Sequence, residues 1–182
     1  MRGLEETVNI CKKMFSNERS TYQGRLYQID NVLNSPQPIQ RPIPIMVGGG
    51  GEKVTLKIAA RYANISHFNT NNLEDLERKI SVLREHCNTL RRDYHEIRKG
   101  TSMSIIVADT GTEAEKKLKN QAKSSNTPIE TLRSQLGPAV GTPKKVADYI
   151  KKYLEKGITL LMFRFSDIND LKILSKEVIP QL

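Results

Sequence analysis

A run of four consecutive glycines, Gly48–Gly51, restricts most strongly what this chain can fold into. An apolar stretch, Ile43–Val47, precedes it, with prolines at 42 and 44, and is typical of a short strand buried on both faces. Apolar residues at helical spacing follow over Glu52–Tyr62, and Ile65–Asn69 has the composition of a second strand. Residues 41–70 are therefore expected to form one strand–loop–helix–strand unit.

Glycines between a strand and a helix leave backbone N–H groups uncovered at the helix N-terminus. This geometry binds anions, phosphate above all. The spacing G-G-G-G-E is not the dinucleotide-binding fingerprint, and without a Lys-Ser/Thr pair it is not a P-loop. On the residues alone, a phosphate-binding loop and a flexible turn both remain open.

The remaining residues alternate between apolar strand-like runs and helical spacing. Strands are expected over 101–108 and 158–165, and a small hairpin over 22–29 with Gly24 at its turn. Helices are expected over 3–15, 72–97, 128–137, 143–156 and 167–178, and another begins at Thr112. Residues 36–44 are a proline-rich link that cannot be helical. Strands alternating with helices predict an α/β fold with a parallel sheet.

The segment 72–97 has apolar residues at alternating steps of three and four. This pattern allows a coiled-coil seam, but a helix that lays one narrow apolar stripe on a sheet is favoured because Cys87 and Tyr94 suit a seam poorly. Cys87 and Cys11 have no metal-ligand spacing and are expected to be reduced thiols. No metal site is expected.

Four segments of the sequence resemble one known family, in the same order. They are L-E-E-T-V-N-I-C-K-K-M-F from Leu4, Y-Q-G-R-L-Y-Q-I from Tyr22, P-I-P-I-M-V-G-G-G-G-E-K-V-T-L-K-I-A-A-R-Y-A-N from Pro42, and G-T-P-K-K-V-A-D-Y-I from Gly141. They resemble the luciferase-like monooxygenases, and most closely the branch that depends on the deazaflavin coenzyme F420. One departure is Asn64, where the family usually has Asp followed by a small residue.

The resemblance implies a (β/α)8 TIM-barrel type fold, with this chain as the half-barrel that holds strands five to eight. Residues 1–182 are then a single domain: 1–44 form the helix, hairpin and proline-rich lead-in, and 45–182 form four βα units. Such barrels typically have about 250 residues. The family's strands one to four, with most of its catalytic groups, have no counterpart here. No catalytic residue is therefore assigned.

The resemblance also implies cofactor contacts at Gly50, Gly51, Glu52 and Thr55, with F420 favoured over FMN as the cofactor. Active sites of such barrels lie at the carboxyl ends of the strands. Three further residues are therefore predicted to face the substrate, namely His67, Asn69 and Arg164. Two alternatives stay open: His67 as an ordinary packed histidine, and Arg164 as an ion-pair partner of Asp167.

Composition and charge limit which classes of partner are expected. The net charge is +9, but the lysines and arginines are scattered over several helices among acids, and no nucleic-acid motif appears. No apolar run approaches the roughly 18 residues of a membrane span, and no leader follows Met1. We expect a cytoplasmic protein that binds neither nucleic acid nor membrane.

The function implied is hydride transfer between a small organic substrate and the cofactor, by an F420- or FMN-dependent oxidoreductase or monooxygenase that is incomplete as this chain. The alternative is a non-catalytic half-barrel that acts as an assembly or interaction module. Either way the strands 43–47 and 158–165 are expected to leave open edges without the lysines that protect an edge. A missing first half-barrel or a second copy is the expected partner.

Overall fold

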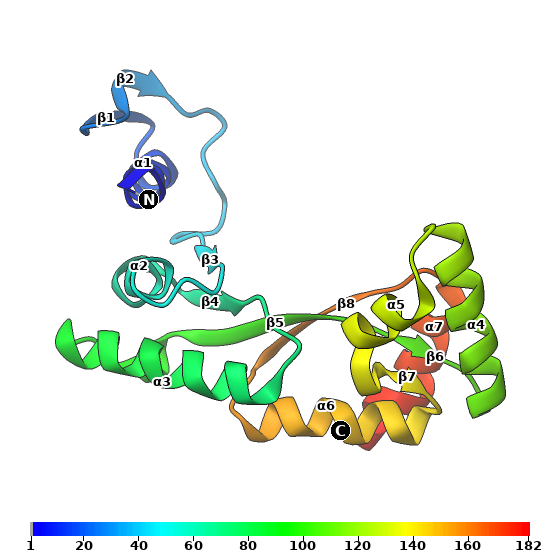
Figure 1. Cartoon of the computed structure of the whole chain (residues 1–182). Helices are drawn as coiled ribbons and strands as arrows, with labels where there is room; N and C mark the ends of the chain where they lie inside the picture. The colour runs from blue at the N-terminus through cyan, green and yellow to red at the C-terminus, as the bar shows by residue number, and fades with distance from the viewer. Residues whose placement is uncertain (1) are drawn as a thin grey trace. The chain divides into compact units, whose positions relative to one another are not determined.

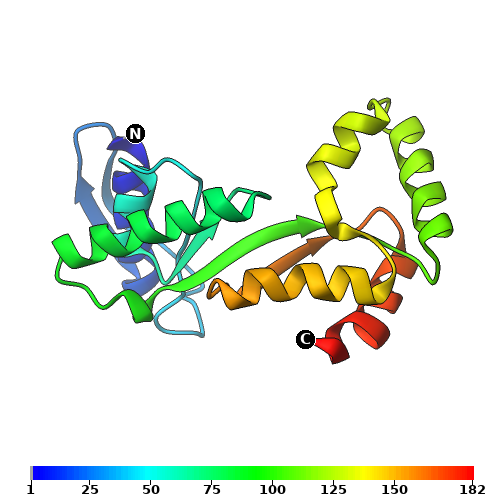
Figure 2. The same cartoon turned by 60° about the horizontal axis from the view of Figure 1, so that its bottom comes forward.

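A computed structural model describes residues 2–182, and its residue contacts divide the chain into two compact units (Figures 1 and 2). The first, here called the N-terminal unit, comprises Met1–His67 and Lys79–Arg98. The second, the C-terminal unit, comprises Phe68–Arg78 and Lys99–Leu182. Each unit has parallel strand pairing and its own buried residues. The predicted α/β class is confirmed, whereas the single domain stays a prediction.

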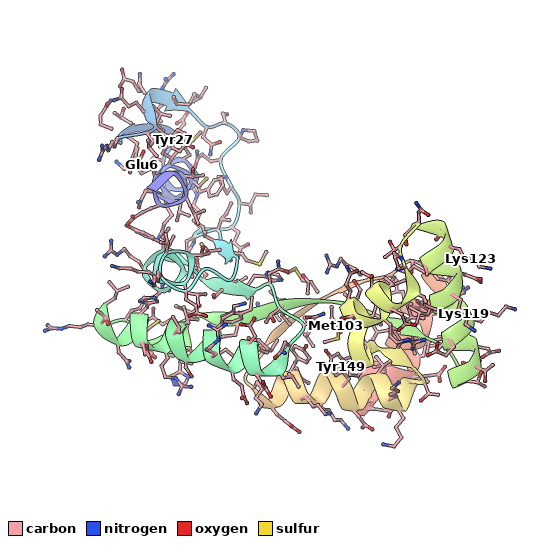
Figure 3. The ribbon with its side chains drawn as sticks, in the orientation of Figure 1. Glu6, Tyr27, Met103, Lys119, Lys123 and Tyr149 are labelled. Atoms are coloured by element: carbon pink, nitrogen blue, oxygen red, sulfur yellow. The ribbon has the colours of Figure 1, made fainter. Side chains whose placement is uncertain are left out.

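The N-terminal unit begins with helix α1 (Arg2–Ser16) packed on an antiparallel hairpin of β1 (Arg19–Gln23) and β2 (Gln28–Leu33). The predicted hairpin is confirmed, and both strands extend beyond the predicted range. Its turn is held by the Glu6 carboxylate, which is 8% exposed and accepts hydrogen bonds from the N–H groups of Arg25, Leu26 and Tyr27 at 2.9–3.1 Å (Figure 3).

The strand before the glycines is shorter than predicted. β3 is Met46–Gly48 and pairs in parallel with β4 (Ile65–Phe68). Val47 is buried but Met46 is 47% exposed, so the prediction of a strand over 43–47 buried on both faces is wrong. Proline at 42 and 44 removes two N–H donors that a paired strand would use.

Asn64 fixes the residue that leads into β3. Its side-chain oxygen accepts the N–H of Ile45 at 2.9 Å, while the Ile45 carbonyl accepts the N–H groups of Asn64 and Ile65 at 2.9 and 3.2 Å. The family's usual Asp could accept the same N–H, so the departure at Asn64 preserves this contact.

Helix α2 (Thr55–Tyr62) packs on β3, and α3 (Leu73–Thr89) follows β4 in the chain. Asn72 caps α3, accepting the N–H of Asp75 at 3.0 Å. The predicted helix over 72–97 is wrong in its last turns. The chain leaves the helix where Arg91 adopts a left-handed φ of 54°, then forms the 3-10 turn η1 (Tyr94–Glu96).

The apolar stripe of α3 is buried as predicted for a helix packed on other elements. Leu76, Leu83 and Cys87 have no exposed surface, and Ile80 is 7% exposed. Neither Cys11 nor Cys87 forms a disulfide within residues 2–182.

The C-terminal unit contains a second pair of parallel strands, β5 (Arg98–Ser104) and β8 (Leu160–Arg164), in register from Gly100–Leu160 to Ser104–Arg164. The strand predicted over 101–108 is interrupted at Ile105 and continues as β6 (Ile106–Val107), which pairs with β7 (Val140–Gly141). The strand predicted over 158–165 is shortened, and its residues 160–163 are half-buried rather than covered on both faces.

Helices of the C-terminal unit are α4 (Gly111–Ser124), α5 (Ile129–Leu136), α6 (Pro143–Glu155) and α7 (Ile168–Ile173), with the 3-10 turn η2 (Gly137–Ala139). α4 starts before the predicted Thr112 because Thr110 caps it, accepting the N–H of Glu113 at 3.2 Å. The predicted closing helix 167–178 begins as α7, changes to a π-turn over Leu174–Val178 and ends in a 3-10 turn, Ile179–Gln181.

The structure also bears on membranes and metals. No helix within residues 2–182 is long and apolar enough to cross a bilayer. Over the same residues, no three His, Cys, Asp or Glu side chains gather closely enough to hold a metal ion.

Candidate functional site

The glycine loop, Gly48–Gly51, lies in the N-terminal unit and contacts β4 directly. Gly48 ends β3 opposite His67, and the N–H of Gly49 donates to the His67 carbonyl at 3.0 Å. Gly49 has φ = +133°, and a Cβ there would lie 3.1 Å from Thr55 Cγ2, so this position requires glycine. The structure thus brings the predicted residue His67 beside the loop.

The loop enters its helix later than predicted. Glu52 to Val54 form a turn, and α2 begins only at Thr55, so the prediction that Glu52 lies in the first helical turn is wrong. The turn is closed by the N–H of Leu56, which donates to the Gly51 carbonyl at 3.0 Å. The His86 ring makes a 2.8 Å hydrogen bond through Nε2 to the Glu52 carbonyl and holds the turn against α3.

Donor groups converge on the middle of the loop. The N–H groups of Gly50 and Gly51 donate to no acceptor within residues 2–182. A Cβ on Gly51 would lie 3.0 Å from Thr55 Oγ1, and one on Gly50 would lie 2.8 Å from Lys79 Nζ. The Lys79 ammonium thus lies beside Gly50 and the Thr55 hydroxyl beside Gly51, next to two amides that have no acceptor within residues 2–182.

Lys79 is the cofactor-site candidate that sequence reasoning missed. It lies on α3, 9% exposed, at a position whose spacing marks it only as a polar residue of that helix. Its nearness to Gly50 results from the packing of α3, which no local pattern encodes. An ammonium group here adds positive charge to the amides of the loop.

The far end of α2 is held by Arg92. Its guanidinium donates to the carbonyls of Ala60 at 2.9 Å and Ala63 at 2.7 Å at the helix C-terminus. A longer contact of 3.5 Å reaches the Ala59 carbonyl, which also accepts the N–H of Ala63 at 2.9 Å. All three alanines are fully buried. Arg92 therefore satisfies the last turn of the helix that starts at the glycine loop and complements its dipole.

A cavity of about 700 Å³ lies in the C-terminal unit. Figure 3 labels two of its residues, Met103 on β5 and Tyr149 on α6. Most of the lining is polar. The side-chain amides are Asn69, Asn71, Gln121 and Gln135, and the hydroxyls are Thr70, Ser102, Ser104, Tyr149 and Tyr153. Arg164 adds one guanidinium, and the apolar side chains are Met103, Leu132 and Leu136. The structure thus brings the predicted residues Asn69 and Arg164 together in one cavity.

Arg164 stands at the carboxyl end of β8, paired in register with Ser104 at the end of β5. It makes no ion pair within residues 2–182. The alternative partner, Asp167, pairs instead with Lys117 at 3.6 Å and accepts the N–H of Asn169 at 2.9 Å. The bond from that N–H holds the pKa of Asp167 below its ordinary value.

Two tyrosines form a fixed wall of the cavity. The hydroxyls of Tyr149 and Tyr153 lie 2.8 Å apart, and both bond to the Asn71 carbonyl, at 3.3 and 3.0 Å. Burial raises the pKa of Tyr153 far above its ordinary value. The two phenols are therefore fixed against the Asn71 carbonyl as one wall of the cavity.

Comparison with known proteins places this geometry in a family. The family model for luciferase-like monooxygenases matches residues 1–131. The FMNH(2)-dependent dimethylsulfone monooxygenase of Pseudomonas putida is 24% identical over 113 residues, 62% of this chain and 30% of that protein. The F420-dependent glucose-6-phosphate dehydrogenase of Kineococcus radiotolerans is 25% identical over 203 residues, 98% of this chain and 60% of that protein.

Solved structures show the fold. An F420-dependent secondary alcohol dehydrogenase in complex with an F420-acetone adduct matches with a TM-score of 0.75 and 16% identity, over 97% of this chain and 60% of the other. A long-chain alkane monooxygenase matches with a TM-score of 0.75 and 17% identity, over 98% and 54%. The predicted TIM-barrel type fold is confirmed. The chain spans between 30% and 60% of the curated relatives described above. It belongs to the luciferase-like monooxygenase family.

Proposed function

We propose that the glycine loop binds the phosphate-bearing chain of a flavin-type cofactor, with F420 preferred over FMN. The observation that supports this most directly is the set of donors around Gly50 and Gly51: two amide N–H groups without an acceptor within residues 2–182, and the Lys79 ammonium. Phosphate oxygens accept from such groups, and amides near a helix N-terminus add to the attraction.

The residues present fit that group in space as well as in charge. A Cβ on Gly50 would lie 2.8 Å from Lys79 Nζ and one on Gly51 would lie 3.0 Å from Thr55 Oγ1, so a side chain at either position would displace the donor beside it. Thr55 would donate its hydroxyl to the same phosphate. The Glu52 carboxylate repels phosphate and would instead accept from hydroxyls of the cofactor's chain.

Both cofactors occur among the relatives. The F420-dependent dehydrogenase aligns with 98% of this chain, whereas the FMNH(2)-dependent monooxygenase aligns with 62%. The longer alignment supports F420. When bound, either cofactor supplies the redox chemistry at its ring, and this chain's residues bind and orient it.

The reaction proposed is hydride transfer between the cofactor and a small organic substrate. We propose His67, Asn69 and Arg164 as substrate-facing residues, His67 beside the glycine loop and the other two in the cavity of the C-terminal unit. The 182 residues span at most 60% of the relatives described above, so we expect no multiple turnover with F420 and simple alcohols from this chain alone. Sustained turnover by the purified chain would contradict this.

The cofactor proposal is tested by titrating the chain with F420 and with FMN while following cofactor fluorescence. Gly51→Val should abolish binding, and Lys79→Met should weaken it by about tenfold, the loss of one charge-assisted contact. Gly111→Ala is the matched control, because a Cβ there meets nothing within 4 Å. Circular dichroism verifies that each variant is folded. A folded Gly51→Val variant that binds as tightly as the wild type overturns the proposal.

A further inference from the structure

We propose that the cavity of the C-terminal unit selects a small polar substrate bearing a carboxylate or phosphate group, and that Arg164 binds this oxyanion. The inference rests on the proposed function in treating the cavity as the substrate site. It goes further by naming the substrate class and the residue that sets it.

The formal charge in the cavity lining is positive only. Among residues 2–182, Arg164 is the one formally charged residue in the lining, and no carboxylate contributes to it. The nearest acidic candidate along the chain, Asp167, is engaged by Lys117. A guanidinium without a counterion in a polar cavity attracts an anion, and its planar fork matches carboxylate and phosphate oxygens two at a time.

The hydrogen bonds already made in the cavity indicate which groups remain for a ligand. The Tyr149 and Tyr153 hydroxyls donate to the Asn71 backbone carbonyl, and the Asn71 side-chain amide donates to the Gln135 backbone carbonyl at 2.8 Å. In contrast, the side chains of Asn69, Ser104 and Arg164 make no hydrogen bond within residues 2–182. An amide, a hydroxyl and a guanidinium are thus left to meet a polar ligand.

Strand geometry places two of these groups together. Ser104 and Arg164 are register partners at the carboxyl ends of β5 and β8. Side chains of register partners project from the same face of a parallel pair. The hydroxyl and the guanidinium therefore face a common ligand at the end of the strands, where barrels of this type bind substrate.

The same lining disfavours a long apolar substrate. Burying an alkyl chain against amides and an unpaired guanidinium would strip those groups of water without replacing their hydrogen bonds. The volume of about 700 Å³ leaves room for a small polar molecule. We therefore expect discrimination by charge: an oxyanion binds where its neutral analogue does not.

Tyrosine fluorescence offers a direct readout, since the chain has no tryptophan and two of its six tyrosines line the cavity. The probes are glycolate, inorganic phosphate and neutral ethylene glycol, titrated into the 182-residue chain at constant ionic strength. At least one of the anions should bind, and ethylene glycol should not. Arg164→Gln should weaken the binding of that anion by about tenfold or more. Arg164→Lys should weaken it less, because the positive charge stays while the two-pronged guanidinium is lost.

Lys123→Gln is the matched control, since it removes one positive charge from a residue outside this cavity. The inference is overturned if neither anion binds, or if ethylene glycol binds as tightly as the anions. It is also overturned if Lys123→Gln weakens anion binding as much as Arg164→Gln does. Loss of anion binding in Gly51→Val alone overturns it too, since this would place the anion at the glycine loop. Cofactor titration of Arg164→Gln separates the two proposals: unchanged F420 binding leaves the glycine-loop function standing whatever the anions do.

Discussion

Replacing Arg92 by Met should destabilise the helix that begins at the glycine loop. The methionine chain keeps much of the apolar stem and removes the guanidinium. The carbonyls of Ala60 and Ala63 then lose donors at 2.9 and 2.7 Å, and the longer 3.5 Å contact to Ala59 disappears as well. The alanines are fully buried, so water has little access to replace these bonds.

The magnitude follows from the two short bonds. A hydrogen bond to a charged group contributes about 1.5–3 kcal/mol, and a buried carbonyl left unpaired costs about 1–3 kcal/mol. Because the Arg92 side chain is 20% exposed, water can reach part of the site and recover some of this loss. We therefore expect a loss of about 2–4 kcal/mol, a large part of the roughly 5–15 kcal/mol that stabilises a typical domain.

Urea denaturation followed by circular dichroism measures this loss as a lower midpoint at unchanged slope. Arg91→Met is the control: it removes the neighbouring guanidinium, from an exposed residue whose side chain makes no hydrogen bond or ion pair within residues 2–182. The urea midpoint of Arg92→Lys should lie between those of the wild type and Arg92→Met, since one ammonium cannot reach all the carbonyls that the guanidinium spans. If Arg92→Met and Arg91→Met unfold at the same urea concentration, the Arg92 contacts do not stabilise the protein.

Three further predictions concern other parts of the chain. Glu6→Gln should cost about 1–3 kcal/mol in unfolding free energy, because a neutral amide replaces a carboxylate that accepts three N–H bonds; exposed Glu18→Gln should be neutral, and equal losses would contradict the role of Glu6. The Arg133 hydrogen bond holds the pKa of Glu115 below its ordinary 4.5, so its small contribution is present above that pH and is lost as the pH falls through the lower folded-state pKa. The difference in stability between the wild type and Arg133→Gln should therefore shrink on acidification, and a difference that grows below pH 4.5 would refute the assignment. Finally, the half-buried apolar residues of β8 should drive association with a second copy or with a missing first half-barrel, since wet apolar surface forfeits roughly 25 cal/mol per Å²; a stable monomer in sedimentation at low micromolar concentration would contradict this.

Much of the fold could be predicted because local chemistry determines it. The Gly24 turn, the Asn72 cap and the Gly137 and Gly157 helix ends each depend on residues adjacent in sequence, and all appear in the structure. The boundaries that failed depend on contacts from further away. Glu52 leaves the helix because the Leu56–Gly51 bond closes a wide turn after the glycines.

The candidate site shows the same division. Its loop could be found from the glycine run, and Asn69 and Arg164 from their places at strand ends, where the structure gives them one cavity. Lys79 could not be found, because it reaches Gly50 from another helix. The engagement of Asp167 by Lys117, which leaves Arg164 without an acidic partner, likewise arises from packing between α4 and the start of α7.

The central claim is that Gly50 and Gly51 bind the phosphate of a flavin-type cofactor. The most direct measurement is an amide NMR titration of the isotope-labelled chain with F420, repeated with inorganic phosphate. The account predicts that the Gly50 and Gly51 amide proton signals move downfield together and saturate with the affinity measured by cofactor fluorescence, while the Gly111 signal stays in place. Saturated F420 binding that leaves the Gly50 and Gly51 signals unmoved would contradict it.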